Sequence, residues 1–127
     1  MANNAEMRKL VFSKTNGFCG YCGEPLLPGW HVDHIIPKHI GGTNTVENKI
    51  PSCASCNIRK SINTPDEFKL LIKTRLIKKL DNAVRKDLYY LSSYLGDLDC
   101  EEILGDYMKL VEKIEAAPIS FYYERDK

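Results

Sequence analysis

The sequence predicts an α+β fold in which a small domain built around a zinc ion is followed by a helical extension of two helices. Three observations indicate this. Two cysteine pairs of identical spacing fall within residues 19–56, short β-branched segments lie between them, and two apolar stripes at helical spacing follow residue 64. We therefore expect a zinc-bound domain over residues 1–64 and a helical extension over residues 65–127.

The length and composition limit the size of the core. The chain has 127 residues, of which 43% are hydrophobic, and this suits a small core with an appended helical part. Residues 1–90 hold 14 basic and 8 acidic side chains, a net +6, whereas residues 91–127 hold 4 and 9, a net −5. The overall charge of +1 therefore marks neither a nucleic-acid binder nor a membrane binder.

The sequence contains no segment typical of a membrane or secreted protein. No apolar run approaches the ~20 residues that are needed to span a bilayer. The N-terminal segment MANNAEMRKL lacks the uninterrupted apolar stretch of a secretory signal. We expect no membrane partner and a cytoplasmic, intracellular location.

Four of the five cysteines form two C-x-x-C pairs, Cys19/Cys22 and Cys53/Cys56. Disulfides do not persist in a reducing compartment, and two such pairs are the usual source of four thiolates for a tetrahedral Zn²⁺. A redox pair or a set of buried thiols is the alternative. The spacer of 30 residues between the pairs exceeds the ~15–20 of a simple zinc ribbon, so functional residues are expected within it. Cys100 has no partner and is expected to pack as a small apolar side chain.

The elements of the first domain follow from local patterns. Residues 4–15 place apolar side chains at helical spacing, and the Asn16-Gly17 pair can end that helix. The β-branched and aromatic segment at residues 30–36 predicts a strand. After a glycine-containing loop, residues 47–50 predict a second extended segment, which can pair with the first as a hairpin. A further helix should begin at the second cysteine pair.

The helical extension begins with a capping box at Thr64–Glu67, which combines an N-cap, a proline at the first helical position and a glutamate at the third. Apolar side chains then recur at steps of three or four. Gly96 is expected to end this helix, Asp99–Glu102 to cap a second one, and Pro118 to stop it. Such stripes indicate core or subunit packing, so we expect these helices to mediate association, with a homodimer as one form of it, or to position substrate; packing within the chain is an alternative. A basic helix that follows phosphates is another alternative.

The insertion between the cysteine pairs carries oxygen and imidazole side chains in a recognisable order. The segments are Val32-Asp33-His34-Ile35-Ile36-Pro37, Gly41-Gly42-Thr43, Glu47-Asn48 and Cys56-Asn57-x2-Lys60. Together with the two cysteine pairs, they resemble the HNH nucleases, also called ββα-metal or His-Me finger nucleases, in their cysteine-knuckle version. The resemblance covers roughly residues 5–65 and implies a zinc-stabilised ββα-metal (HNH) domain for that half of the chain.

The resemblance also implies an activity, the metal-dependent cleavage of DNA that leaves 5′-phosphate and 3′-hydroxyl ends. Such hydrolysis needs a base to deprotonate water and a cation to stabilise charge on the transition state. By similarity, His34 is the general base, Asp33 and Asn57 ligate one catalytic Mg²⁺ or Mn²⁺, and Asn48 orients the base by holding its loop. The structural Zn²⁺ would be bound by Cys19, Cys22, Cys53 and Cys56. In the HNH motif the third residue is histidine, whereas this sequence has Asn57 at that position. Because its side chain offers an oxygen ligand, Mg²⁺ or Mn²⁺ is favoured over a catalytic Zn²⁺.

Several assignments remain alternatives at this point. Lys60 matches the lysine of the family's CN-x2-K signature and is a candidate phosphate contact or a solvated helix lysine. His31 is a candidate substrate contact or a surface histidine, and His39 is undecided. One such centre cuts one strand, so a monomer would nick DNA and a double-strand break would need a dimer. The competing hypothesis is a catalytically inactive HNH-type zinc module that binds DNA or a protein partner in a larger assembly.

Overall fold

The structure, a computed structural model, describes the backbone of residues 4–95 and 100–125 and the side chains of residues 4–89 and 102–125. The chain divides into two compact units. The first unit comprises Met1–Phe68 together with Ile119–Lys127, and the second unit is Lys69–Pro118. The predictions for Gly96, for Asp99 and for the side chain of Cys100 lie outside the described residues.

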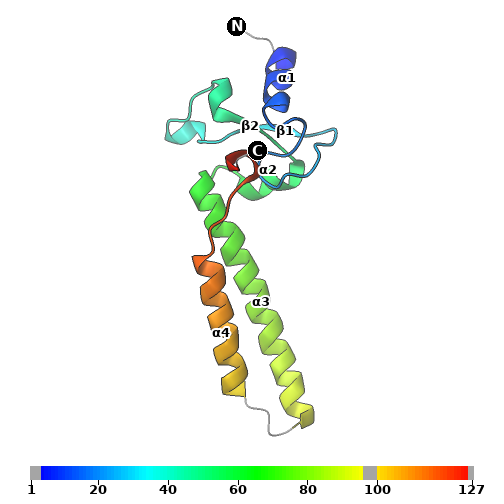
Figure 1. Cartoon of the computed structure of the whole chain (residues 1–127), viewed down its shortest axis with the longest axis vertical. Coiled ribbons are helices and arrows are strands. Elements are labelled where there is room, and N and C mark those ends of the chain that lie inside the picture. The colour runs from blue at the N-terminus through cyan, green and yellow to red at the C-terminus, as the bar shows by residue number, and fades with distance from the viewer. Residues whose placement is uncertain (1–3, 96–99, 126–127) are drawn as a thin grey trace. The chain divides into compact units, whose positions relative to one another are not determined.

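The first unit contains two helices and a two-stranded sheet (Figure 1). Its elements are α1 (Asn4–Lys14), β1 (His31–His34), β2 (Lys49–Ser52) and α2 (Ala54–Lys60), with short 3-10 turns at Lys38–Ile40 and Val46–Asn48. The strands are antiparallel and place Asp33 opposite Ile50 and His34 opposite Lys49. The predicted α+β class is confirmed, as is the order of two strands followed by a helix.

The core of the first unit is small and lies where α1 meets β2. Val11 of α1 is fully buried, and Ile50 of β2 is 2% exposed. A Cβ atom at Gly20 would lie 2.2 Å from the Cγ1 of Ile50, so the residue after the first cysteine has to be glycine for this close approach. The helix α1 ends where Asn16 and Gly17 adopt positive φ angles of 53° and 86°, as the sequence predicts.

Four aromatic residues pack together beside the first cysteine pair. This aromatic cluster consists of Tyr21, Phe68, Phe121 and Tyr123. The rings of Phe68 and Phe121 stack with their centroids 5.2 Å apart. The C-terminal segment at residues 119–125 thus returns to the first unit, which no pattern in the sequence predicted.

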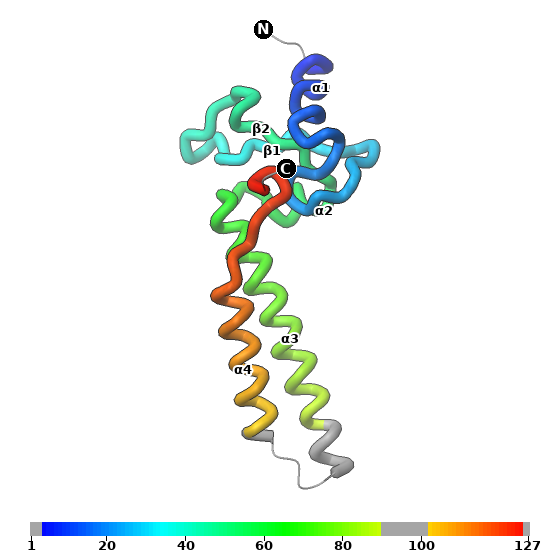
Figure 2. Tube along the Cα trace, in the orientation of Figure 1, coloured from blue at the N-terminus to red at the C-terminus, as the bar shows by residue number. Residues whose placement is uncertain are grey.

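The second unit is a hairpin of α3 (Pro65–Leu95), whose first turn belongs to the first unit, and α4 (Cys100–Ala116). The two helices lie side by side and antiparallel (Figure 2). Leu88 of α3 and Tyr107 and Val111 of α4 are buried, whereas Leu76 and Leu110 of the predicted apolar stripes are exposed. The capping box is present, because Thr64 and Glu67 exchange hydrogen bonds of 3.0 and 3.1 Å between backbone N–H and side-chain oxygen.

Within the part of the chain that the structure describes, none of the helices has both the length and the apolar character that crossing a bilayer requires.

Candidate functional site

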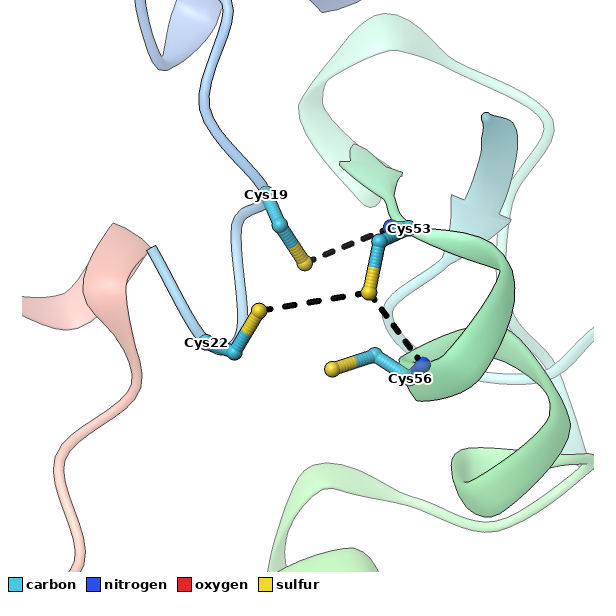
Figure 3. Close-up of side chains that lie close together, drawn as sticks. All are labelled: Cys19, Cys22, Cys53 and Cys56. Atoms are coloured by element: carbon cyan, nitrogen blue, oxygen red, sulfur yellow. Dashed lines mark hydrogen bonds between the residues drawn. The ribbon is translucent and has the colours of Figure 1, made fainter. Parts of the chain in front are cut away.

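The four paired cysteines converge on one point in the first unit (Figure 3). Their sulfur atoms all lie within 4.8 Å of one another, and Cys22 Sγ is 3.9 Å from Cys53 Sγ. A tetrahedral Zn²⁺ with Zn–S bonds of about 2.3 Å places sulfur atoms roughly 3.8 Å apart. All four cysteines are free thiols. They are therefore positioned for zinc binding, and they join the loop after α1 to the start of α2.

The backbone around the cluster favours thiolate sulfur. Cys53 donates its N–H to Cys19 Sγ at 3.3 Å, and Cys56 donates its N–H to Cys53 Sγ at 3.4 Å. A hydrogen bond from the Cys56 thiol is the main cause that lowers the pKa of Cys19 to about 4, and the same contact, together with burial, raises the pKa of Cys56.

Asp33 and His34 lie at the end of β1 and line one pocket of about 350 Å³. The other lining residues are Val32, Pro37, Lys38, His39, Ser61 and Ile62. We call this the catalytic pocket after the roles that the resemblance implies for Asp33 and His34. Lys38 and His39 are exposed, so its lining includes groups that can meet a phosphate. His34 also lines a neighbouring pocket of about 360 Å³ together with Arg8 and Lys49. His34 thus lines two pockets, and each of them is also lined by basic side chains.

The carboxylate of Asp33 is held through one of its two oxygens. Oδ2 accepts hydrogen bonds from the Tyr21 hydroxyl at 2.5 Å and from Lys60 Nζ at 2.9 Å. Burial, and next the negative charge of Asp33, raise the pKa of Tyr21, so its hydroxyl stays protonated and donates. Asp33 Oδ1 makes no hydrogen bond to another described residue. Since no buried polar side-chain atom of the described residues lacks a partner, Oδ1 is accessible to solvent, and Asp33 is one of the residues that line the pocket.

Lys60 occupies a different place from the one expected. The sequence suggested a lysine at the surface, in contact with phosphate or with water, whereas Lys60 is 0% exposed. Its ammonium group can be buried because it pairs with Asp33 and also donates to the backbone oxygen of His34 at 2.9 Å. Both surface assignments, the phosphate contact and the solvated lysine, are therefore wrong. Lys60 ties α2 to the two consecutive residues of β1 that carry the predicted chemistry.

Asn48 fastens the loop that follows His34. Its Oδ1 accepts from the backbone N–H of Ile36 at 2.9 Å, and its Nδ2 donates to the backbone oxygens of Ile36 at 3.0 Å and Thr43 at 2.8 Å. A Cβ atom at Gly42 would lie 1.7 Å from the Ile36 oxygen, so this turn of the loop requires glycine. The conformation of the loop after His34 is thus fixed by the side-chain hydrogen bonds of Asn48 and by the close approach of Gly42 to the backbone of Ile36.

Asn44 contacts the imidazole of His34 directly. The distance from His34 Nε2 to Asn44 Oδ1 is 3.2 Å. An amide oxygen can only accept a hydrogen bond, so in a neutral ring Nε2 carries the proton and Nδ1 keeps its lone pair. Sequence reasoning missed Asn44, because nothing in its spacing distinguishes it from other loop asparagines.

The remaining predicted residues are placed as follows. Asn57 lies on α2 three residues before Lys60, and therefore on the same helix face. Its side chain is half-buried and makes no hydrogen bond to another described residue, and the structure gives no contact between it and Asp33. His31 is exposed at the start of β1 and does not line the catalytic pocket, whereas His39 does. Sequence reasoning also missed Arg8 and Tyr21.

Comparison with known proteins adds one finding. Residues 19–62 match the family model described as HNH endonuclease. No curated protein matches the chain. The matched segment runs from the first cysteine to two residues past Lys60 and contains both the cysteine cluster and the catalytic pocket, without α1 and the second unit.

Proposed function

Because this chain carries an HNH endonuclease domain at residues 19–62, we propose that it hydrolyses phosphodiester bonds of DNA with one catalytic Mg²⁺ or Mn²⁺ and holds a structural Zn²⁺. One observation carries the proposal. Asp33 and His34 line the same pocket. Hydrogen bonds occupy Oδ2 of Asp33 and Nε2 of His34, so Oδ1 of Asp33 remains available to bind a metal ion and Nδ1 of His34 to accept a proton. A carboxylate oxygen and a lone-pair imidazole nitrogen are the groups that this reaction needs.

The donors fit a small, hard cation. Carboxylate and amide oxygens are the ligands that Mg²⁺ and Mn²⁺ prefer, and Mg²⁺ usually keeps several waters, so two protein ligands suffice. Asp33 Oδ1 is accessible to solvent, and the Asn57 amide has no hydrogen-bond partner among the described residues. When bound, such an ion supplies positive charge that stabilises the transition state and the leaving oxygen.

The chain's own residues account for the proton transfer. His34 Nδ1 takes a proton from a water molecule, whose oxygen attacks the phosphorus opposite the 3′-oxygen. The new P–O bond forms as the bond to the 3′-oxygen breaks, which leaves a 5′-phosphate and, after protonation, a 3′-hydroxyl. Asn44 fixes the tautomer of the base, and Asn48 holds the loop behind it. Lys38 and His39 in the pocket lining can bind neighbouring phosphates.

Replacing either proposed metal ligand is expected to raise the Mg²⁺ concentration that gives half-maximal cleavage by about tenfold or more, because loss of about 1.4 kcal/mol of binding free energy is a tenfold loss of affinity. Asn57→Ala and Asp33→Asn are the suitable changes. Asp33→Asn keeps an amide oxygen that can accept from the buried ammonium of Lys60, whereas Asp33→Ala would leave that ammonium without this acceptor and so destabilise the fold more. The measurement is the rate of plasmid nicking over a Mg²⁺ titration.

The control for these variants is Ile58→Ala, because Ile58 lies on the same helix as Asn57 but is 76% exposed. Its metal dependence should equal that of the wild type. If both Asn57→Ala and Asp33→Asn kept the wild-type metal dependence, the catalytic centre would have to lie elsewhere.

We further propose that one chain cuts one strand and that two copies, paired through α3 and α4, are needed to cut both. The exposed leucines Leu76 and Leu110, at 46% and 48%, are the positions to test. Leu88 is unsuitable because it is buried inside the hairpin, and the side chain of Leu91 lies outside the described residues. Light scattering should show a dimer at high concentration, and Leu76→Lys with Leu110→Lys should give monomers that still nick supercoiled plasmid without linearising it. A wild type that stays monomeric refutes the pairing.

The same plasmid assay separates the enzyme from an inactive module. Mg²⁺-dependent conversion of supercoiled to nicked DNA, abolished by EDTA, supports the nuclease. DNA binding without any conversion over Mg²⁺ and Mn²⁺ titrations supports the inactive alternative.

A further inference from the structure

Tyr21 reaches the predicted metal ligand from an unexpected direction. It lies between the cysteines of the first pair, yet its hydroxyl donates to Asp33 Oδ2 at 2.5 Å. Tyr21 is only 3% exposed, so this hydroxyl is buried against the carboxylate. A residue of the zinc knuckle, by which we mean residues 19–22 with the first cysteine pair, therefore contacts a residue of the catalytic pocket directly.

The ring of Tyr21 is held by three other rings. Phe68, Phe121 and Tyr123 contact it edge-on, with centroids 5.5, 5.0 and 5.9 Å away and interplanar angles of 77°, 84° and 87°. Edge-to-face contacts of this kind are favourable and fix the orientation of the ring. Two of the three rings belong to the C-terminal segment at residues 119–125.

Backbone hydrogen bonds fasten the same C-terminal segment to the knuckle. Tyr122 donates its backbone N–H to the backbone carbonyl oxygen of Tyr21 at 3.1 Å, and Tyr123 donates its backbone N–H to the backbone carbonyl oxygen of Gly20 at 2.8 Å. The ring of Phe121 is 3% exposed, so the segment is anchored by burial as well. The position of the Tyr21 hydroxyl thus depends on residues 100 positions later in the chain.

We propose that Tyr21 is a positioning residue for the metal-binding carboxylate of Asp33, and that the C-terminal segment at residues 119–125 completes the catalytic site by holding Tyr21 in place. The proposal rests on the proposed function. Two donors, the Tyr21 hydroxyl and the Lys60 ammonium, fix Oδ2, and a carboxylate with one oxygen fixed has its other oxygen aimed in one direction. Groups that orient a metal ligand in this way typically change metal affinity by about 10–100-fold when they are removed.

The test is direct Mn²⁺ binding to the zinc-loaded full chain, measured by electron paramagnetic resonance of the free ion. Tyr21→Phe keeps the ring and removes only the hydroxyl, and it should raise the dissociation constant for Mn²⁺ by about 10-fold or more. Zinc content should stay at the wild-type value, and the melting temperature should change little, because Lys60 still pairs with Asp33.

The matched control is Tyr123→Phe, which removes a hydroxyl from the same aromatic cluster. That hydroxyl makes no hydrogen bond to another described residue, so Mn²⁺ affinity should be unchanged. A purely structural role for the tyrosine rings would make the two variants behave alike, and equal Mn²⁺ affinity in Tyr21→Phe and wild type would overturn the proposal.

Phe121→Leu tests the part played by the C-terminal segment. It should weaken Mn²⁺ binding in the wild-type background and have no further effect in the Tyr21→Phe background, because both changes act through one hydroxyl. Additive effects, or no effect in either background, would remove the C-terminal segment from the proposal. If Tyr21→Phe fails to fold, the wild-type background alone still tests the proposal, because unchanged Mn²⁺ affinity in Phe121→Leu would overturn the role of the C-terminal segment.

Asp33→Asn separates this inference from the function on which it rests. If the wild type binds Mn²⁺ no better than Asp33→Asn, the metal site itself is wrong and both proposals are overturned. If Asp33→Asn loses the binding while Tyr21→Phe keeps it, only the role of Tyr21 is overturned.

Discussion

Replacing His34 with alanine is expected to lower the rate constant for DNA cleavage by about 10²–10⁴-fold, the usual cost of losing a general base. The fold should survive, because the imidazole is only half-buried and its side-chain hydrogen bond goes to a loop asparagine, Asn44. The backbone of residue 34 keeps its pairing with Lys49 and its hydrogen bond from Lys60. The measurement is single-turnover nicking of supercoiled plasmid at saturating Mg²⁺.

Two further measurements on His34→Ala distinguish a lost base from a damaged fold. Zinc content and DNA affinity should match those of the wild type, and added imidazole should restore part of the nicking rate by replacing the missing ring. Nicking at the wild-type rate without imidazole would show that His34 is not the base.

Removal of zinc is expected to unfold the first unit. Its buried apolar residues are few, and the four cysteines join the loop after α1 to the start of α2. Structural zinc sites in small domains contribute an apparent ~10–16 kcal/mol, which is as large as the ~5–15 kcal/mol by which whole domains are stable. Elemental analysis should find one zinc per chain.

The single tryptophan offers a specific probe of this unfolding. Trp30 lies in the first unit, where its ring packs beside Phe12 and beneath the guanidinium of Arg8, 3.9 Å from the ring centroid. Its fluorescence should report loss of this packing when a chelator removes the metal or when Cys19→Ser removes a ligand. A chain without zinc that shows wild-type Trp30 emission and a cooperative melting transition would contradict the expectation.

The features that the sequence predicted correctly are local ones. The cysteine pairs, the two short strands and the capping box at Thr64–Glu67 each depend on residues within a few positions of one another. Their side-chain chemistry and spacing determine the local geometry, so they can be recognised without knowledge of the rest of the fold. Asp33 and His34 line one pocket although successive side chains of a strand point to opposite faces, and this was not predicted from their spacing.

What the sequence did not predict depends on contacts between distant segments. Lys60 was expected at the surface because an unpaired lysine is rarely buried, and its partner Asp33 lies on another element. The hydrogen bond from Tyr21 to Asp33 joins the first cysteine pair to β1, and two of the three rings that hold Tyr21 come from residues 119–125. Periodicity and motif spacing do not predict side-chain contacts between segments that lie far apart in the sequence.

The return of the C-terminal segment to the knuckle has a consequence for synthesis on the ribosome. All four cysteines emerge once residue 56 has left the exit tunnel, so zinc can bind early. The rings of Phe121 and Tyr123 emerge more than sixty residues later, and only then can Tyr21 be enclosed. Because chains fold as their segments emerge from the N-terminal end, nascent and truncated chains would hold zinc while Asp33 still lacks its final support. The environment of Asp33 would thus be completed only after zinc binding, when residues 119–125 pack against Tyr21.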